Sequence, residues 1–167
     1  MPLIKKYNSK PVSILSKCSG FTLLEVMVAM VIFSIGLLGL ASLQGQSLQF
    51  SHGAYLKSQA TFYAYDVLDK MRANRTIALG GSYNASTSST GSDKGCYDDT
   101  GNCSASDMAL HDIYDWKQLL ASLPDGNGSI TSSSGGSTTT FLVTVSWTDA
   151  NASGGGGTES LTVRSEL

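Results

Sequence analysis

The longest apolar stretch of the chain lies close to its N-terminus. Residues 21–43 read FTLLEVMVAMVIFSIGLLGLASL, in which the polar side chains are Thr22, Glu25, Ser34 and Ser42. As an α-helix this stretch is roughly 35 Å long, which is enough to cross the hydrocarbon core of a bilayer. The pattern therefore predicts a membrane-spanning helix over residues 21–43.

A second helical pattern follows without a break. Apolar side chains recur there at spacings of three and four residues: Ala60, Tyr63, Ala64, Val67, Leu68 and Met71. Such a stripe is typical of an amphipathic helix with one buried face. Since no proline occurs between Pro11 and Pro124, we expect one helix from about Phe21 to about Arg75, with residues 44–75 as its amphipathic continuation.

Residues 76–167 predict a small head of mixed structure. The segment 80–106 is rich in Gly, Ser and Thr and reads as an irregular loop. Asp107 is the predicted N-cap of a helix over MALHDIYDWKQLLASL, which ends at Leu123–Gly126. The apolar stripe expected to face a sheet is Ile113, Trp116, Leu120 and Leu123.

Three strands are expected after this helix. Residues 138–148 alternate clearly, whereas 128–132 show a weak strand pattern and 158–165 form the third candidate. Residues 149–157 would then be the loop of an antiparallel hairpin. The predicted fold class is α+β, with a long N-terminal helix packed on a small antiparallel sheet.

Charge fixes the expected orientation of the membrane segment. Lys5, Lys6, Lys10 and Lys17 precede it, and the next basic residue is Lys57. The positive-inside rule places residues 1–20 in the cytoplasm and everything after about residue 44 outside. The net charge of −2 over 167 residues gives no basic excess, so nucleic-acid binding is not indicated.

Two simpler explanations of the N-terminus are a secretory signal peptide and a plain anchor. The apolar stretch is too long for a signal peptide, although Gly39-x-Ala41 could be a cleavage site. A plain anchor leaves Glu25 unexplained, because a carboxylate inside a membrane segment costs about 2.5 kcal/mol or more and marks a functional candidate.

The residues Ser19-Gly20-Phe21-Thr22-Leu23-Leu24-Glu25-Val26 resemble the N-terminal signal of type IV pilins and pseudopilins. In that family a prepilin peptidase cuts after the glycine, on the cytoplasmic side, and methylates the new N-terminus. The resemblance implies that residues 1–20 are a cleaved leader, that cleavage follows Gly20, and that Phe21 becomes N-methylated. Thr22 and Glu25 belong to the motif and are expected to serve assembly.

A buried Glu25 needs a partner, and the resemblance supplies one in the amine of Phe21 on a neighbouring subunit. Removing one partner of a buried ion pair costs roughly 3–5 kcal/mol, so such a pair penalises wrong registers between subunits. Cleavage would also remove four of the 11 basic residues and leave seven against 13 acidic ones.

The family implies a structural protein and its partners. These are the prepilin peptidase, other minor pilins, the major pilin and the inner-membrane assembly platform. The expected location is the inner membrane, with a single pass and a cytoplasmic N-terminus, and afterwards the pilus at the cell surface. Residues 107–149 and the segment GLLGLASLQ further resemble the PilV branch of minor pilins, which favours a subunit that primes or caps the filament tip. A type II secretion pseudopilin and a tip-displayed adhesin remain as alternatives.

No catalytic or cofactor-binding constellation is found in the sequence. Cys96 and Cys103 enclose CYDDTGNC and are expected to form a structural disulfide outside the cytoplasm. His52 and His111 fall on predicted helices and are expected at the surface or partly buried. Two oxygen-rich segments, 149–154 and 98–102, are explained by turn chemistry better than by calcium. We therefore expect no enzyme, no cofactor and no metal.

Overall fold

The computed structural model describes residues 20–98, 102–136, 138–150 and 156–167. Its elements are α1 (Leu23–Ala73), α2 (Arg75–Leu79), α3 (Ala105–Leu120), β1 (Asn127–Gly135), β2 (Thr138–Asp149) and β3 (Gly157–Glu166). The chain separates into two compact units, one ending at Leu43 and one running from Gln44 to Leu167. The α+β fold with its long N-terminal helix and small antiparallel sheet is confirmed.

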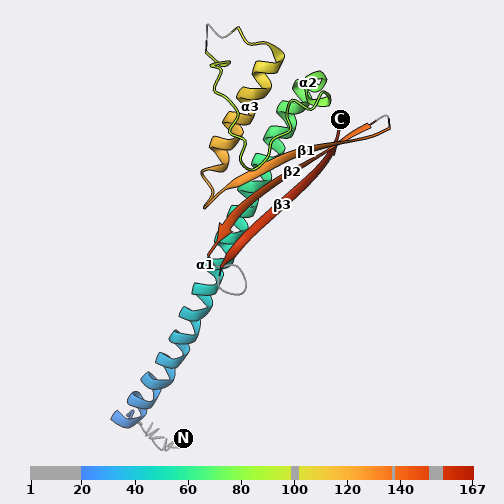
Figure 1. The fold of residues 1–167 in the computed structure, drawn as a ribbon. Helices are drawn as coiled ribbons and strands as arrows, with labels where there is room; N and C mark the ends of the chain where they lie inside the picture. The colour runs from blue at the N-terminus through green and yellow to red at the C-terminus, as the bar shows by residue number, and fades with distance from the viewer. Residues whose placement is uncertain (1–19, 99–101, 137, 151–155) are drawn as a thin grey trace, which may run out of the picture. The chain divides into compact units, whose positions relative to one another are not determined.

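The second unit contains a three-stranded sheet in the order β1-β2-β3 (Figure 1). Both pairings are antiparallel, with Ile130 opposite Val143 and Val143 opposite Val163. Strand β1 is longer than the predicted 128–132, because its Ser- and Gly-rich end pairs with β2 as far as Gly135 opposite Thr138. Pairing with a strong neighbour overrides the weak strand pattern of that segment.

The core lies between the inner face of the sheet and the two long helices. Strand β2 contributes Phe141, Val143, Val145 and Trp147, and all four are buried. The predicted stripe of α1 is buried as well and belongs to the same cluster, with Leu56 added at its start. Every residue of this core belongs to the second unit.

Helix α3 contacts both the sheet and α1. The Trp116 indole donates a hydrogen bond to the Tyr63 carbonyl on α1 at 3.0 Å. A Cβ added at Gly128 on β1 would lie 2.7 Å from the Trp116 ring and 2.8 Å from Leu120. Glycine at this position therefore allows the predicted apolar stripe of α3 to approach the sheet closely.

Two predicted helix boundaries are wrong. The N-cap of α3 is Ser104 rather than Asp107: its hydroxyl oxygen accepts the Asp107 N–H at 3.1 Å, and its O–H donates to the Asp107 carboxylate at 2.6 Å. The helix ends at Leu120, three residues before the predicted Leu123.

The long helix α1 ends at Ala73 because Asn74 leaves helical geometry and donates a side-chain hydrogen bond to the Ala105 carbonyl at 2.7 Å.

The loop before α3 largely follows the prediction. In its described part, residues 80–98 and 102–104 form no helix or strand, apart from one bridge between Ala85 and Ile130 on β1. A disulfide joins Cys96 to Cys103 within this loop. The disulfide holds the loop beside the start of α3.

Candidate functional site

The first turn of α1 contains the residues of the N-terminal motif. Gly20 and Phe21 precede the helix, and the Phe21 side chain is 82% exposed. The Thr22 hydroxyl accepts a hydrogen bond from the Glu25 N–H at 3.3 Å. This bond satisfies one of the backbone donors that a helix start leaves unpaired, so Thr22 acts as a cap for α1.

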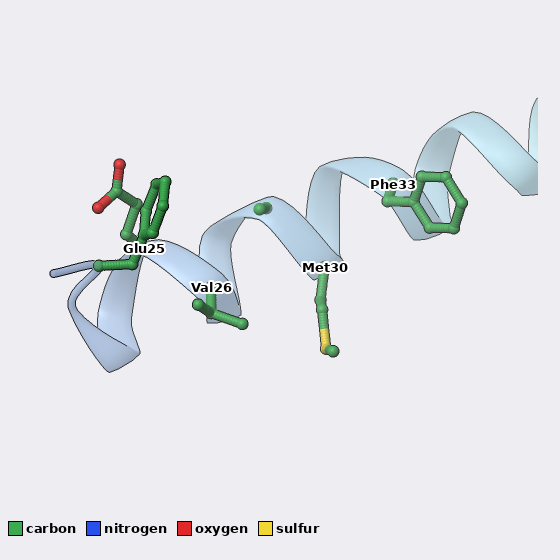
Figure 2. A pocket seen from close by; sticks show the side chains of 6 residues that line it. Glu25, Val26, Met30 and Phe33 are labelled. Carbon is green, nitrogen blue, oxygen red and sulfur yellow. The ribbon is translucent and has the colours of Figure 1, made fainter.

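Glu25 lies in the first turn of the helix. A carboxylate there is favoured by the partial positive charge of the helix N-terminus. Figure 2 shows its carboxylate pointing outward, while Val26, Met30 and Phe33 follow along the helix. Negative charge and a large apolar surface are therefore adjacent on one exposed helix.

A hollow of about 590 Å³ marks this surface. It is lined by Phe21, Glu25, Val26, Ala29, Met30 and Phe33. The small Ala29 lies among larger apolar side chains, which gives the helix surface relief into which a side chain of another helix can pack. The wall is almost wholly apolar, and Glu25 is its one ionisable group.

Residues 20–52 are exposed throughout. The window of highest hydropathy in α1 has a mean hydropathy of 2.5, and none of it is buried. By length and composition the helix is able to cross a membrane. An apolar helix without a polar face is stable only when lipid or other helices cover it.

A charged cluster in the second unit was not recognised in the sequence. The Lys70 ammonium on α1 lies 3.8 Å from Asp66, 4.0 Å from Asp112 and 3.9 Å from Asp115. Asp112 is buried and accepts hydrogen bonds from the Tyr83 and Tyr97 hydroxyls. The signal in the sequence was the i,i+4 pair Asp66–Lys70, which did not reveal that α3 supplies the other two carboxylates.

The two tyrosines of this cluster resist ionisation. Tyr97 is largely exposed, but desolvation of its hydroxyl and the hydrogen bond to Asp112 raise its pKa to about 12. The same two causes raise the pKa of Tyr83 above its ordinary value. A phenolate at either position would face the Asp112 carboxylate, which favours the neutral phenols.

Lys117 joins α3 to two other segments. Its ammonium donates to the carbonyls of Ser86, Thr87 and Gly128 and to the Asn127 side chain, over distances of 2.6–3.3 Å. Burial lowers the pKa of this ammonium. These bonds fasten the loop after α2 and the start of β1 to one helix, which indicates a structural role.

The residues considered for other chemistry do not form a site. His52 is exposed, whereas His111 is fully buried, beyond the partial burial expected, because Tyr97 and Tyr114 pack against its ring. Among the described residues, no three His, Cys, Asp or Glu side chains are placed to hold a metal ion. The two calcium candidates lie partly outside the described residues, at 99–101 and 151–154.

Two family models match the chain, one directly after the other. The prokaryotic N-terminal methylation motif matches residues 15–41, and the family described as Type IV pilin Tt1218 matches residues 42–114. No curated protein and no solved structure matches the chain. The first match ends within the exposed apolar half of α1, and the second covers the rest of α1, the loop and the first ten residues of α3.

The family matches agree with the N-terminal motif, the capped first turn with Glu25, the apolar helix and the small antiparallel sheet. This chain therefore belongs to the type IV pilins, a structural family.

Proposed function

We propose that this chain is a minor pilin that takes part in type IV pilus assembly and primes or caps the filament at its tip. The observation that carries the proposal is the exposed apolar surface of residues 21–43 with one carboxylate, Glu25, at its start. That surface is suited first to a bilayer and then to a bundle of like helices. The resemblance to the PilV branch supports a minor rather than a major subunit.

The proposed route begins in the inner membrane, with residues 1–20 on the cytoplasmic side. The prepilin peptidase cleaves after Gly20 and methylates Phe21. The processed chain then joins other minor pilins, the major pilin and the inner-membrane assembly platform. Leader residues 1–19 lie outside the described residues, whereas Gly20 and Phe21 are both exposed.

Within an assembly, Glu25 would pair with the Phe21 amine of a neighbouring subunit. The two groups have opposite charge and stand at the start of the same helix, so a small axial shift between neighbours brings them together. A wrong shift leaves an unpaired carboxylate in an apolar bundle, which costs several kcal/mol. Glu25 therefore sets the register between subunits.

The test compares Glu25→Ala, Glu25→Val and the isosteric Glu25→Gln with the parent chain. We expect normal cleavage after Gly20 in all three variants but much lower piliation, because the charge that pairs with the Phe21 amine is gone. Immunoblots for leader removal and quantification of sheared pili are the readouts. Normal piliation in the Gln and Ala variants would refute the register role.

A type II secretion pseudopilin shares the same N-terminal motif. Deletion of the gene discriminates between the two systems: loss of surface pili supports the pilus, and loss of exoprotein secretion with normal pili supports the secretion system.

One observation favours an additional adhesive role. Tyr97 in the disulfide loop is 61% exposed and lines a hollow of about 520 Å³ together with Lys70, Asn74 and Asp112. An aromatic ring beside fixed polar groups is a common arrangement in ligand sites. Glycan binding by the parent protein that Tyr97→Ala abolishes would support this role.

A further inference from the structure

The two edges of the sheet differ in how the chain covers them. On β1, the Ile130 N–H and C=O exchange hydrogen bonds with Ala85 at 2.8 and 2.9 Å. The neighbouring Gly128 carbonyl accepts from the Lys117 ammonium at 2.6 Å. Strand β3 forms the opposite edge, and no strand or bridge in the described residues pairs with its outer side.

The hydrogen-bond pattern identifies which groups of β3 point outward. The Leu167 N–H donates to the Thr139 carbonyl, just beyond the end of the β2–β3 ladder. Since backbone groups alternate sides along an antiparallel strand, odd-numbered residues of β3 face β2 and even-numbered ones face the open edge. These outward residues are Thr158, Ser160, Thr162, Arg164 and Glu166, and all are exposed.

This edge is long and regular. The β2–β3 pairing is continuous from Thr140 opposite Glu166 to Asp149 opposite Gly157, without a bulge. The strand contains no proline. Bulges, prolines, covering loops and charged side chains are the usual means by which proteins prevent strand addition at an edge. On the outer side of β3, the described chain shows only the last of these, in Arg164 and Glu166.

The side chains of β3 leave apolar surface beside the open edge. Val143 and Val145 on β2 are fully buried. Their partners Val163 and Leu161 pack against the same core but are only partly buried. The apolar face of the sheet therefore extends from the buried valines of β2 onto the partly exposed β3.

We propose that the outer edge of β3 is a docking surface for an extended segment of a different pilus subunit, which adds to the sheet as an antiparallel fourth strand. An open strand edge selects an extended chain, because only such a chain matches its alternating donors and acceptors. The segment carries apolar side chains beside Leu161 and Val163. It carries an acidic side chain opposite Arg164, whose guanidinium has a long contact of 3.5 Å to Thr140.

A second copy of this chain does not fit the surface. When β3 pairs antiparallel with itself over its full length, Arg164 lies opposite Ser160 and Glu166 lies opposite Thr158. A second copy therefore places no acidic side chain opposite Arg164. The occupant is therefore a different subunit, and the inference rests on the proposed assembly of this chain into a pilus.

The test is a single substitution, Thr162→Pro, with Thr162→Val as its matched control. Proline removes the outward N–H at the centre of β3 and leaves the bonds to β2 intact, because a proline is tolerated at an edge when its nitrogen faces outward. The valine variant loses the hydroxyl contact to Thr144 but keeps the N–H. Both variants are expressed in the native cells and quantified in membranes and in sheared pili.

We expect the parent chain and Thr162→Val to enter pili equally. The amount of Thr162→Pro in pili should be lower by about fivefold or more, because the proline removes one main-chain hydrogen bond and blocks the edge sterically. Equal incorporation of the proline variant would overturn the docking surface. Absence of the parent chain from pili would instead refute the proposed function. Thermal melts of the purified variants identify any folding defect.

A second measurement needs no variant. Hydrogen exchange is compared between the parent chain in purified pili and the same chain in detergent. The account expects slower exchange at the Ser160, Thr162 and Arg164 amides in pili, with little change at Leu161 and Val163, which are bonded to β2 in both states. Equal exchange at the outward amides in both states would contradict the inference, whatever the proline variant does.

Discussion

The two halves of α1 are one continuous helix with opposite relations to their surroundings. Residues 23–43 expose every side chain, and apolar residues occur on all sides. From Leu56 to Met71 the same helix buries one stripe in the core and exposes polar side chains such as Lys57 and Asp69. Backbone hydrogen bonding does not explain this difference, because the same helical hydrogen bonds run through both halves.

The two halves of α1 are stabilised by different surroundings. The second half is stabilised within the chain, by packing against β2 and α3. The first half has no cover in the chain and depends on lipid or on other helices. A substitution should therefore affect folding in one half and assembly in the other.

The largest effect is expected from Trp116→Ala, compared with Phe33→Ala. Trp116 is fully buried and donates to the Tyr63 carbonyl, so its loss should lower the free energy of unfolding by about 3–5 kcal/mol. Phe33 is 68% exposed, and its loss should change head stability by less than about 0.5 kcal/mol. Urea unfolding of the mature chain in detergent measures both. Trp116 lies on α3 and contacts the second half of α1 through Tyr63. Similar values for the two variants would show that this packing stabilises the second half of α1 no more than Phe33 stabilises the first.

An intermediate effect is expected from Lys117→Met. The ammonium donates to four acceptors in two segments, and methionine keeps the apolar stem but removes every donor. We expect a loss of about 2 kcal/mol, since hydrogen bonds from charged groups are the stronger ones and the Gly128 carbonyl is left without this donor. Lys57→Met, at an exposed position of α1, is the control. Equal stability of the two variants would show that these bonds are not needed.

The smallest effect concerns the buried carboxylate and its phenols at alkaline pH. Unfolded tyrosine ionises near pH 10, whereas the pKa of Tyr97 is about 12 in the folded head. Because the folded pKa is the higher one, the stabilisation is fully present below about pH 10 and is lost as the pH rises through about 12. The free energy of unfolding should therefore fall between about pH 10 and pH 12.

Tyr97→Phe tests the origin of that fall. At neutral pH this substitution should lower the free energy of unfolding by about 1 kcal/mol, the value of one ordinary hydrogen bond. At alkaline pH the free energy of unfolding of the variant should decline less steeply than that of the parent chain. Tyr83 keeps part of the decline, since its pKa is raised too. Tyr65→Phe, which alters an exposed phenol on α1, is the control. An unchanged pH profile in Tyr97→Phe would show that this phenol does not couple to Asp112.

The fold was predictable where the pattern was strong and local. The stripe of α1 and the alternation of β2 each follow from one period and one buried face. The extent of β1 was not predictable, because Ser132–Gly135 form a strand only through pairing with β2. The end of α1 depends on a contact between Asn74 and Ala105, residues far apart in the sequence.

The same holds for the candidate site: residues of a local motif could be predicted from the sequence, and residues united by packing could not. Gly20, Phe21, Thr22 and Glu25 were singled out because the motif is contiguous, and their roles in processing and assembly stay predictions. The disulfide partners were recognised because two cysteines remain after the leader. The cluster of Lys70 with Asp66, Asp112 and Asp115 was missed, since helix packing unites residues that the sequence separates. The open edge of β3 likewise follows from strand order, which no local pattern encodes.

The central claim is that the mature chain begins at a processed Phe21, directly before the exposed apolar half of α1. The most direct measurement is intact mass and N-terminal peptide mass spectrometry of the protein from native membranes. The account predicts a mature chain that begins with N-methylated Phe21. A chain that begins after Ala41, or an uncut Met1 form in cells with active prepilin peptidase, would contradict it.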